Sequence, residues 1–158
     1  MIQTGWEATA IDYSDATPDI AFTYDRLGRQ IGVTDGSGQR NFTFNEYLQP
    51  ESEIITGAVQ AVITRAYDSM GRGAGFSTDS NYALTYGYDS FGRFQNVGYA
   101  VDGMAGAASY DYLANSGLLE SVSMLQDGAN TAITATYGYE PHRNVKTLVT
   151  NQFGAEKV

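Results

Sequence analysis

The sequence predicts an all-β protein, an antiparallel meander of about twelve strands that forms a curled sheet or an open barrel. Three observations support this fold: a repeat of about twenty residues, aromatic residues spaced two apart within each repeat, and turn residues between the strands. Helix has little support, because the best helical stretch, residues 113–124, is interrupted by Asn115-Ser116-Gly117.

The repeat consists of a Tyr-Asp pair followed, after two residues, by Gly-Arg, and it occurs three times in this strict form. Weaker copies begin at Phe44, Tyr112 and Tyr139, so that about six units fill the chain. A period near twenty residues is too short for a repeated pair of helices and suits two strands with two turns. The strict copies contribute Tyr24, Asp25, Gly28, Arg29, Tyr67, Asp68, Gly71, Arg72, Tyr88, Asp89, Gly92 and Arg93.

Each residue of the repeat has an expected role in a hairpin. An aromatic residue precedes most anchors by two positions, which places both rings on one face of a strand; Arg65, before Tyr67, is the exception. The aspartate is expected to accept backbone N–H bonds, and the glycine to take the positive φ of a turn with a bulge. The arginine is expected to stack on a ring or to pair with a turn aspartate across the ribbon. The alternative is a row of arginines that faces a ligand.

A second class of turn separates the repeats and helps to divide the chain. Its clearest members are Asp35-Gly36-Ser37-Gly38, Asp102-Gly103 and Asp127-Gly128. We expect a lead-in strand and acidic turn over residues 1–21, a repeat domain of about six units over 22–150, and a tail over 151–158.

Tyr-Asp-x-x-Gly-Arg recurring about every twenty residues resembles the YD repeat of the Rhs and teneurin proteins, and the resemblance runs from about Phe22 to Thr150. It implies a β-hairpin ribbon that spirals into a hollow shell, which encloses a toxin in bacterial members and forms part of a cell-surface receptor in animals. Carbohydrate binding is associated with such repeats, and members are often secreted or at the cell surface. The chain has few units, lacks the family's shell-closing core segment, and no toxin domain follows; a curled sheet or small open barrel is therefore expected.

The composition excludes several function classes. Nine basic against eighteen acidic residues give a net charge of −9, which argues against binding to nucleic acid. With two lysines in the chain, a basic membrane-binding patch is not expected either. The absence of cysteine excludes disulfides and thiolate chemistry, and a single histidine excludes multi-histidine metal centres. No signal peptide or transmembrane segment is recognisable in the chain.

Three groups of residues are candidates for chemistry or binding. Asp12, Asp15 and Asp19 fall within eight residues and are a candidate Ca²⁺ site, although their spacing does not match an EF-hand and solvated turn aspartates are the alternative. His142, the only imidazole, is the candidate general base of a hydrolase, with Glu140 beside it; the alternative is that it fills the turn where other units carry glycine. The candidate ring platform for a carbohydrate consists of Tyr86, Tyr88, Tyr110 and Tyr137.

Three hypotheses for the function follow. The first is a structural, encapsulating or interaction module, part of or derived from a larger Rhs-like protein, which self-associates through its sheet edges. The second is a carbohydrate-binding module whose rings stack on a sugar or another small ligand. The third is a calcium-dependent hydrolase of a small ester or lactone; no recognised catalytic motif, such as a Gly-x-Ser-x-Gly elbow, is present.

Overall fold

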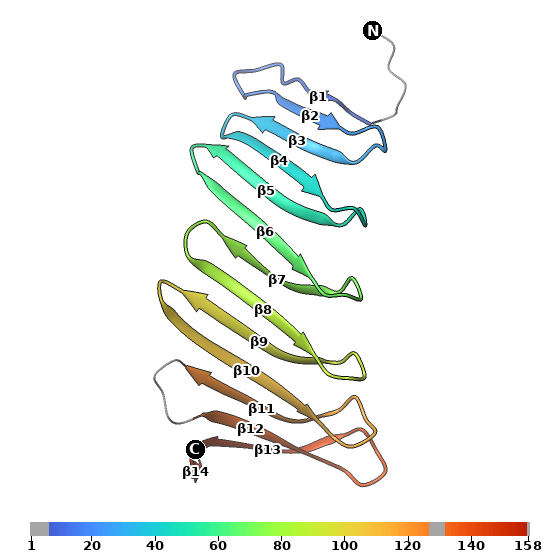
Figure 1. Ribbon diagram of the computed structural model, residues 1–158, viewed down its shortest axis with the longest axis vertical. Coiled ribbons are helices and arrows are strands. Elements are labelled where there is room, and N and C mark those ends of the chain that lie inside the picture. The colour runs from blue at the N-terminus through green and yellow to red at the C-terminus, as the bar shows by residue number, and fades with distance from the viewer. Residues whose placement is uncertain (1–6, 127–131, 158) are drawn as a thin grey trace. The chain divides into compact units, whose positions relative to one another are not determined.

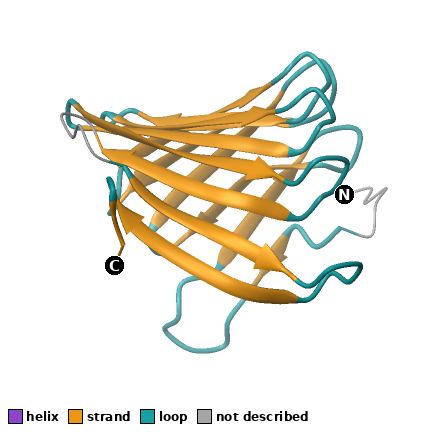
Figure 2. Cartoon of the chain, turned by 90° about the horizontal axis from the view of Figure 1, so that it is seen from below, coloured by secondary structure: helices purple, strands orange, loops and turns teal. Residues whose placement is uncertain are grey.

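The computed structural model describes residues 7–126 and 132–157, and within them it contains fourteen β-strands and no helix (Figures 1 and 2). The predicted all-β antiparallel meander is therefore confirmed, with two more strands than expected. The strands are β1 Ala10–Ile11, β2 Ile20–Tyr24, β3 Gln30–Asp35, β4 Gly38–Phe44, β5 Pro50–Gly57, β6 Ala61–Tyr67, β7 Gly73–Thr78, β8 Tyr82–Tyr88, β9 Phe94–Val101, β10 Met104–Tyr112, β11 Leu119–Gln126, β12 Ile133–Tyr139, β13 Lys146–Phe153 and β14 Glu156–Lys157.

The chain divides into two compact units. The first comprises the described residues up to Ala66 together with Ser77–Ser80, and the second comprises Tyr67–Phe76 together with the described residues from Asn81 onward. In the first unit β1 to β6 pair in chain order, and in the second β8 to β14 do the same, always antiparallel. Within each unit the last strand does not return to the first, so neither sheet closes into a barrel.

Strand alternation gives the second unit two chemically different faces. Because paired residues point to the same side of a sheet, one row across β8 to β13 defines the aromatic face and the neighbouring row defines the polar face. The aromatic-face row is Tyr86, Val97, Ala108, Met124, Ile133 and Phe153. The polar-face row is Gly87, Asn96, Ser109, Ser123, Thr134 and Gln152.

Neither unit has a closed hydrophobic core among the described residues. No hydrophobic side chain there is fully buried, and Met124, Ile133 and Phe153 on the aromatic face of the second unit are each about half exposed. A sheet of one layer covers neither of its faces, so its own backbone ladder and its turns must hold it together.

A β-bulge follows each of five repeat turns. Just after the turn the pairing register shifts, so that one residue of the later strand has no partner in the earlier strand. The extra residues are Ile31, Glu51, Gln95, Glu120 and Thr147. The repeat therefore sets a local twist and redirects one side chain in each hairpin.

The second class of turn is built as its residues predict. At the β3–β4 hairpin the Asp35 carboxylate accepts hydrogen bonds from the backbone N–H of Ser37 at 2.7 Å and from its hydroxyl. At the β9–β10 hairpin Asp102 and Gly103 have φ angles of 49° and 83°, as a type I′ turn requires. The predicted turn at Asp127-Gly128 lies outside the described residues.

Candidate functional site

The most repeated chemical arrangement in the molecule is the turn clamp, an aspartate and an arginine four residues apart in each strict repeat. In the turn after β2, one carboxylate oxygen of Asp25 accepts the backbone N–H of Leu27 at 2.8 Å and that of Arg29 at 3.0 Å. The other oxygen accepts Nε–H of Arg29 at 2.7 Å. The same three bonds recur in the other strict turns: Asp68 accepts from Met70 and twice from Arg72, and Asp89 accepts from Phe91 and twice from Arg93.

The clamp holds the glycine of the repeat in its special conformation. Gly28, Gly71 and Gly92 have φ angles of 79°, 78° and 81°, and each N–H donates to the carbonyl of the aspartate three residues earlier. A residue with a Cβ is destabilised by about 1–2 kcal/mol in this left-handed region, because the Cβ clashes with the backbone. This cost accounts for glycine at that position.

The clamp arginines also bind the next repeat. The guanidinium of Arg29 lies 4.2 Å from the centre of the Phe44 ring, and in the second unit Arg72 and Arg93 lie 4.1 Å and 4.4 Å from the rings of Tyr88 and Tyr112. The arginine therefore both stacks on a ring and pairs with a turn aspartate. The paired aspartate belongs to the same turn and does not lie across the ribbon, where the sequence suggested it.

The anchor tyrosines complete the link with their hydroxyl groups. The hydroxyl of Tyr88 donates to the carbonyl of Gly73 at 2.9 Å, that of Tyr112 to Phe94 at 2.6 Å, and that of Tyr139 to Leu119 at 2.8 Å. In the first unit Tyr24 donates in the same way to Ala8 at 2.9 Å. The clamp side chains and these tyrosine hydroxyls therefore bind inside the sheet, while Nη1 of Arg29 is buried without a hydrogen-bond partner among the described residues.

The clamp lowers the pKa of its aspartates. For Asp25 and Asp89, desolvation acts to raise the pKa, but the hydrogen bonds and charge of the clamp arginine outweigh it. For Asp68 the largest effect is the hydrogen bond from the backbone N–H of Arg72, which lowers the pKa. All three carboxylates are therefore held in their charged form.

One turn of the first unit carries a neutral version of the clamp. Asn45 accepts the backbone N–H groups of Tyr47 and Gln49 at 3.0 Å each, and its amide donates to the side-chain oxygen of Gln49 at 3.1 Å. Leu48 takes the place of the glycine with a φ of 65°. The turn geometry therefore survives without charge.

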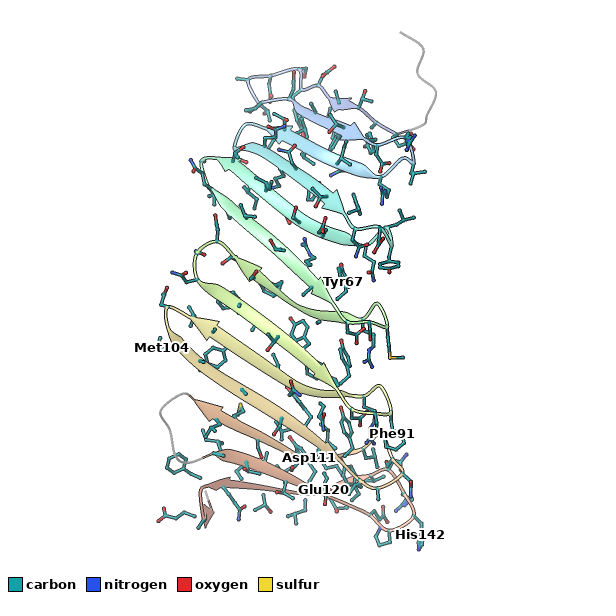
Figure 3. The ribbon with its side chains drawn as sticks, viewed as in Figure 1. Tyr67, Phe91, Met104, Asp111, Glu120 and His142 are labelled. Carbon is teal, nitrogen blue, oxygen red and sulfur yellow. The ribbon has the colours of Figure 1, made fainter. Side chains whose placement is uncertain are left out.

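His142 lies in a longer turn, between β12 and β13, at the outer end of the hairpin (Figure 3). The hydrogen bond that closes this turn joins the N–H of Glu140 to the carbonyl of Val145, one residue farther than in the strict repeats. His142 has a φ of 64°, one position before the place of the glycine in a strict turn, and it is exposed. Glu140 forms an ion pair with Arg143. Whether His142 and Glu140 act in a hydrolase stays a prediction.

The acidic turn before β2 uses two of its three aspartates as local hydrogen-bond acceptors. Asp19 accepts the backbone N–H of Tyr13 at 2.9 Å, and Asp15 accepts that of Thr17 at 2.9 Å. Hydrogen bonds from Thr17, chiefly from its side chain, lower the pKa of Asp15. Asp12, Asp15 and Asp19 form no group of three metal ligands, and the described residues contain no such group elsewhere. The calcium site stays a prediction.

The four predicted platform tyrosines are half-buried and lie against other side chains. Phe94 packs against Tyr86, Tyr88 and Tyr110, with ring centres 5.3–5.8 Å apart. The ammonium of Lys146 lies 4.0 Å from the centre of the Tyr137 ring. Phe94 thus joins Tyr86, Tyr88 and Tyr110 in one ring cluster, and the availability of the four tyrosines to a sugar stays a prediction.

The second unit contains a pocket of about 490 Å³ that the sequence did not indicate. Its lining includes Asp111 and Glu120, which come from the neighbouring strands β10 and β11 (Figure 3). Glu120 is the extra residue of a bulge, and Asp111 accepts the hydroxyl of Ser121 at 3.0 Å. The other lining residues are Asp89, Arg93, Gln95, Tyr110, Tyr112, Ser121, Thr134 and Thr136. The pocket is thus rich in carboxylate, hydroxyl and amide groups.

The chain resembles solved structures in fold. A chain in a crystal structure of TcdB2-TccC3 matches with a TM-score of 0.53 and 16% identity, over 87% of this chain and 9% of that one. A chain in a crystal structure of TcdB2-TccC3-Cdc42 matches with a TM-score of 0.45 and 16% identity, over 89% and 9%. The protein therefore spans less than a tenth of the length of these solved chains. No protein-family model and no curated protein sequence matches it.

The residues that the structure describes include no helix long and apolar enough to cross a membrane.

Proposed function

We propose that the protein is a structural module, a YD-repeat wall segment that covers or encloses other protein with one of its faces. One observation carries the proposal: the characteristic residues of the repeat contact each other and the next repeat, while Met124, Ile133 and Phe153 on the aromatic face of the second unit remain half exposed. An enzyme concentrates its reactive groups at one site, whereas this chain distributes the same Asp-Arg-Tyr set along its length. The likeness in fold to the TcdB2-TccC3 chain agrees with a repeat scaffold.

Covalent footprinting with a photoactivated carbene tests the proposal directly. The aromatic face of the second unit should be labelled at Met124, Ile133 and Phe153 in the purified chain and protected when labelling is done in the cells that make the protein. Leu27 at an exposed turn serves as the reference for equal labelling efficiency. Equal labelling of the aromatic face in both settings would contradict a wall whose face is covered.

A second candidate function is carbohydrate binding, and the pocket on β10 and β11 favours it. Sugar hydroxyls bind carboxylate, amide and hydroxyl groups, and the lining offers all three beside Tyr110 and Tyr112. A glycan array followed by calorimetry tests this function. Asp111→Asn and Glu120→Gln should abolish binding, and Glu46→Gln, at an exposed turn, is the matched control.

The calcium-dependent hydrolase is a third proposal, and it makes a separate prediction. Hydrolysis of a small ester or lactone should disappear with a chelator, with His142→Asn and with an Asp→Asn change at Asp15 or Asp19. Hydrolysis that continues unchanged under all of these treatments would contradict the proposal. So would a rate of hydrolysis no higher than that of the buffer alone.

A further inference from the structure

Five of the seven arginines of the chain fall into two groups with different surroundings. Each clamp arginine donates to its aspartate at 2.6–2.7 Å and stacks on a ring. Arg40 on β4 and Arg65 on β6 instead flank one carboxylate, that of Glu53 on β5, at 3.8 Å and 3.5 Å. These distances are longer than a hydrogen bond, and neither guanidinium makes a hydrogen bond to another described residue.

The repeat makes Arg65 unusual. It stands two residues before its anchor, where five other units carry Phe or Tyr. In the first unit the rows Phe22, Val33, Arg40, Ile55 and Phe42, Glu53, Ile63 define an aromatic face. The Arg65 side chain shares this face with Ile63, two residues earlier. At the same position of the second unit Tyr86 and Tyr110 pack against the Phe94 ring, whereas Arg65 faces the carboxylate of Glu53.

The strand register places an apolar strip through the same cluster. Phe42, Glu53 and Ile63 lie directly opposite one another across β4, β5 and β6, and Arg40 lies opposite Ile55. All of these side chains share the aromatic face of the first unit. The cluster thus combines two guanidiniums with a phenyl ring and two isoleucines.

The charge and exposure of the cluster leave room for an anion. Two guanidiniums against one carboxylate give a net charge of +1 in a protein of net charge −9. The Glu53 side chain is 13% exposed, whereas those of Arg40 and Arg65 are 54% and 36% exposed. Glu53 is therefore the most covered member of the cluster, while the two arginine side chains stay open to solvent.

We infer that Arg40, Arg65 and the apolar strip beside them bind a carboxylate with an apolar body. The guanidinium fork matches the two oxygens of a carboxylate, and the bond between two charged groups is stronger than a neutral one. The apolar body would cover Phe42 and Ile63 on the same face. This binding goes beyond the proposed wall function, which requires no small ligand.

The test is a titration with hexanoate at low ionic strength, followed by the side-chain Nε–H signals of the arginines in a nitrogen–proton NMR spectrum. Hexanoate should bind saturably and shift Arg40 and Arg65; acetate, which lacks the apolar body, should bind more weakly, and hexylammonium should not bind. No saturable binding of hexanoate, or equal binding of acetate, would overturn the inference. Tighter binding of inorganic phosphate would overturn the assignment to a carboxylate.

Arg65→Tyr is the decisive variant, because it restores the aromatic residue of the repeat. It should fold and weaken hexanoate binding by about tenfold or more, since the bidentate charged contact is lost. Arg40→Gln should weaken binding as well and covers the case in which Arg65→Tyr does not fold. Arg26→Gln, at an exposed turn of the same unit, is the matched control and should bind as the unchanged chain does. If Arg65→Tyr and Arg40→Gln both bound hexanoate as the unchanged chain does, the arginine cluster would be an ion-pair network that binds no ligand.

Discussion

The turns at the ends of β8 and β12 lie in the same unit and carry the same kinds of residue, yet their chemistry differs. In the strict turn, Asp89 accepts two backbone N–H groups and Nε–H of Arg93, and both side chains are largely covered. In the turn after β12, Glu140 and Arg143 form an ion pair whose arginine is 67% exposed.

The difference arises from loop length and from glycine. The longer turn closes from Glu140 to Val145, and its left-handed residue is His142, where the strict turn uses Gly92. Arg143 follows Glu140 by only three residues, whereas Arg93 follows Asp89 by four and so places its Nε–H on a carboxylate oxygen of Asp89 and its guanidinium over the Tyr112 ring. An acid and an arginine therefore form the clamp when they are four residues apart and not when they are three apart.

The largest effect is expected when all clamp aspartates are protonated together. The pKa values of Asp25, Asp68 and Asp89 lie below the ordinary value of about 4, so near that pH the unfolded chain binds more protons than the folded chain. Their contribution to stability is therefore complete at neutral pH and is lost as the pH falls below about 4. Urea unfolding at a series of pH values measures this loss, and Asp68→Asn should make the dependence shallower. A free energy of unfolding that stays constant on acidification would contradict the clamp.

The next largest effect is expected when the arginine of each turn is replaced, because the loss of unfolding free energy should differ between the two turns. Arg93→Gln loses the bond to Asp89, the stacking on Tyr112 and a bond to the carbonyl of Ser116, and should cost about 2 kcal/mol. That loss corresponds to roughly 4–8 °C in Tm. Arg143→Gln should change the free energy of unfolding by less than about 0.5 kcal/mol, as exposed ion pairs do. Equal losses in thermal denaturation would show that the two turns are alike.

Glycine substitutions probe the backbone of the strict turn. Gly92→Ala should destabilise the protein by about 1–2 kcal/mol, because its φ of 81° is unfavourable for a residue with a Cβ. Gly117→Ala is the control: no atom lies within 4 Å of the added Cβ and its φ is not in the left-handed region. The control should be neutral or slightly stabilising. Urea unfolding of both variants decides whether the left-handed conformation is the cause.

The smallest expected effect has the opposite sign. His142→Gly should stabilise the fold by about 0.5–1 kcal/mol, because glycine adopts a φ of 64° without the steric cost that histidine bears. Differential scanning calorimetry measures the expected rise in Tm. A fall in Tm would mean that the imidazole makes a stabilising contact that outweighs its backbone cost.

The turns were predictable from sequence because their chemistry is local. Asp25, Gly28 and Arg29 act within five residues, so their spacing alone indicates the carboxylate acceptor and the left-handed glycine. The neutral clamp of Asn45 was visible only as a weaker copy of the repeat. That His142 is the left-handed residue, one position earlier in a longer turn, became visible only in the backbone conformation.

The pocket and the arginine cluster were not predictable, because both depend on pairing register. Glu120 reaches the pocket as the extra residue of a bulge, and the sequence does not show where a register shifts. Glu53 meets Arg40 and Arg65 across three strands, which no spacing along the chain reveals. The one available signal was Arg65 itself, the departure from the aromatic pattern.

Each clamp arginine reaches the ring of the following repeat, and this has a consequence for how such chains change in length. Because a repeat contributes two strands, gaining or losing a whole repeat preserves strand direction and leaves every remaining side chain on its own face. Insertion of a single residue within a strand would exchange the faces beyond it. Duplication and deletion of whole units are therefore the changes that this architecture tolerates, and the neutral and lengthened turns show that one unit can differ while its neighbours carry the clamp.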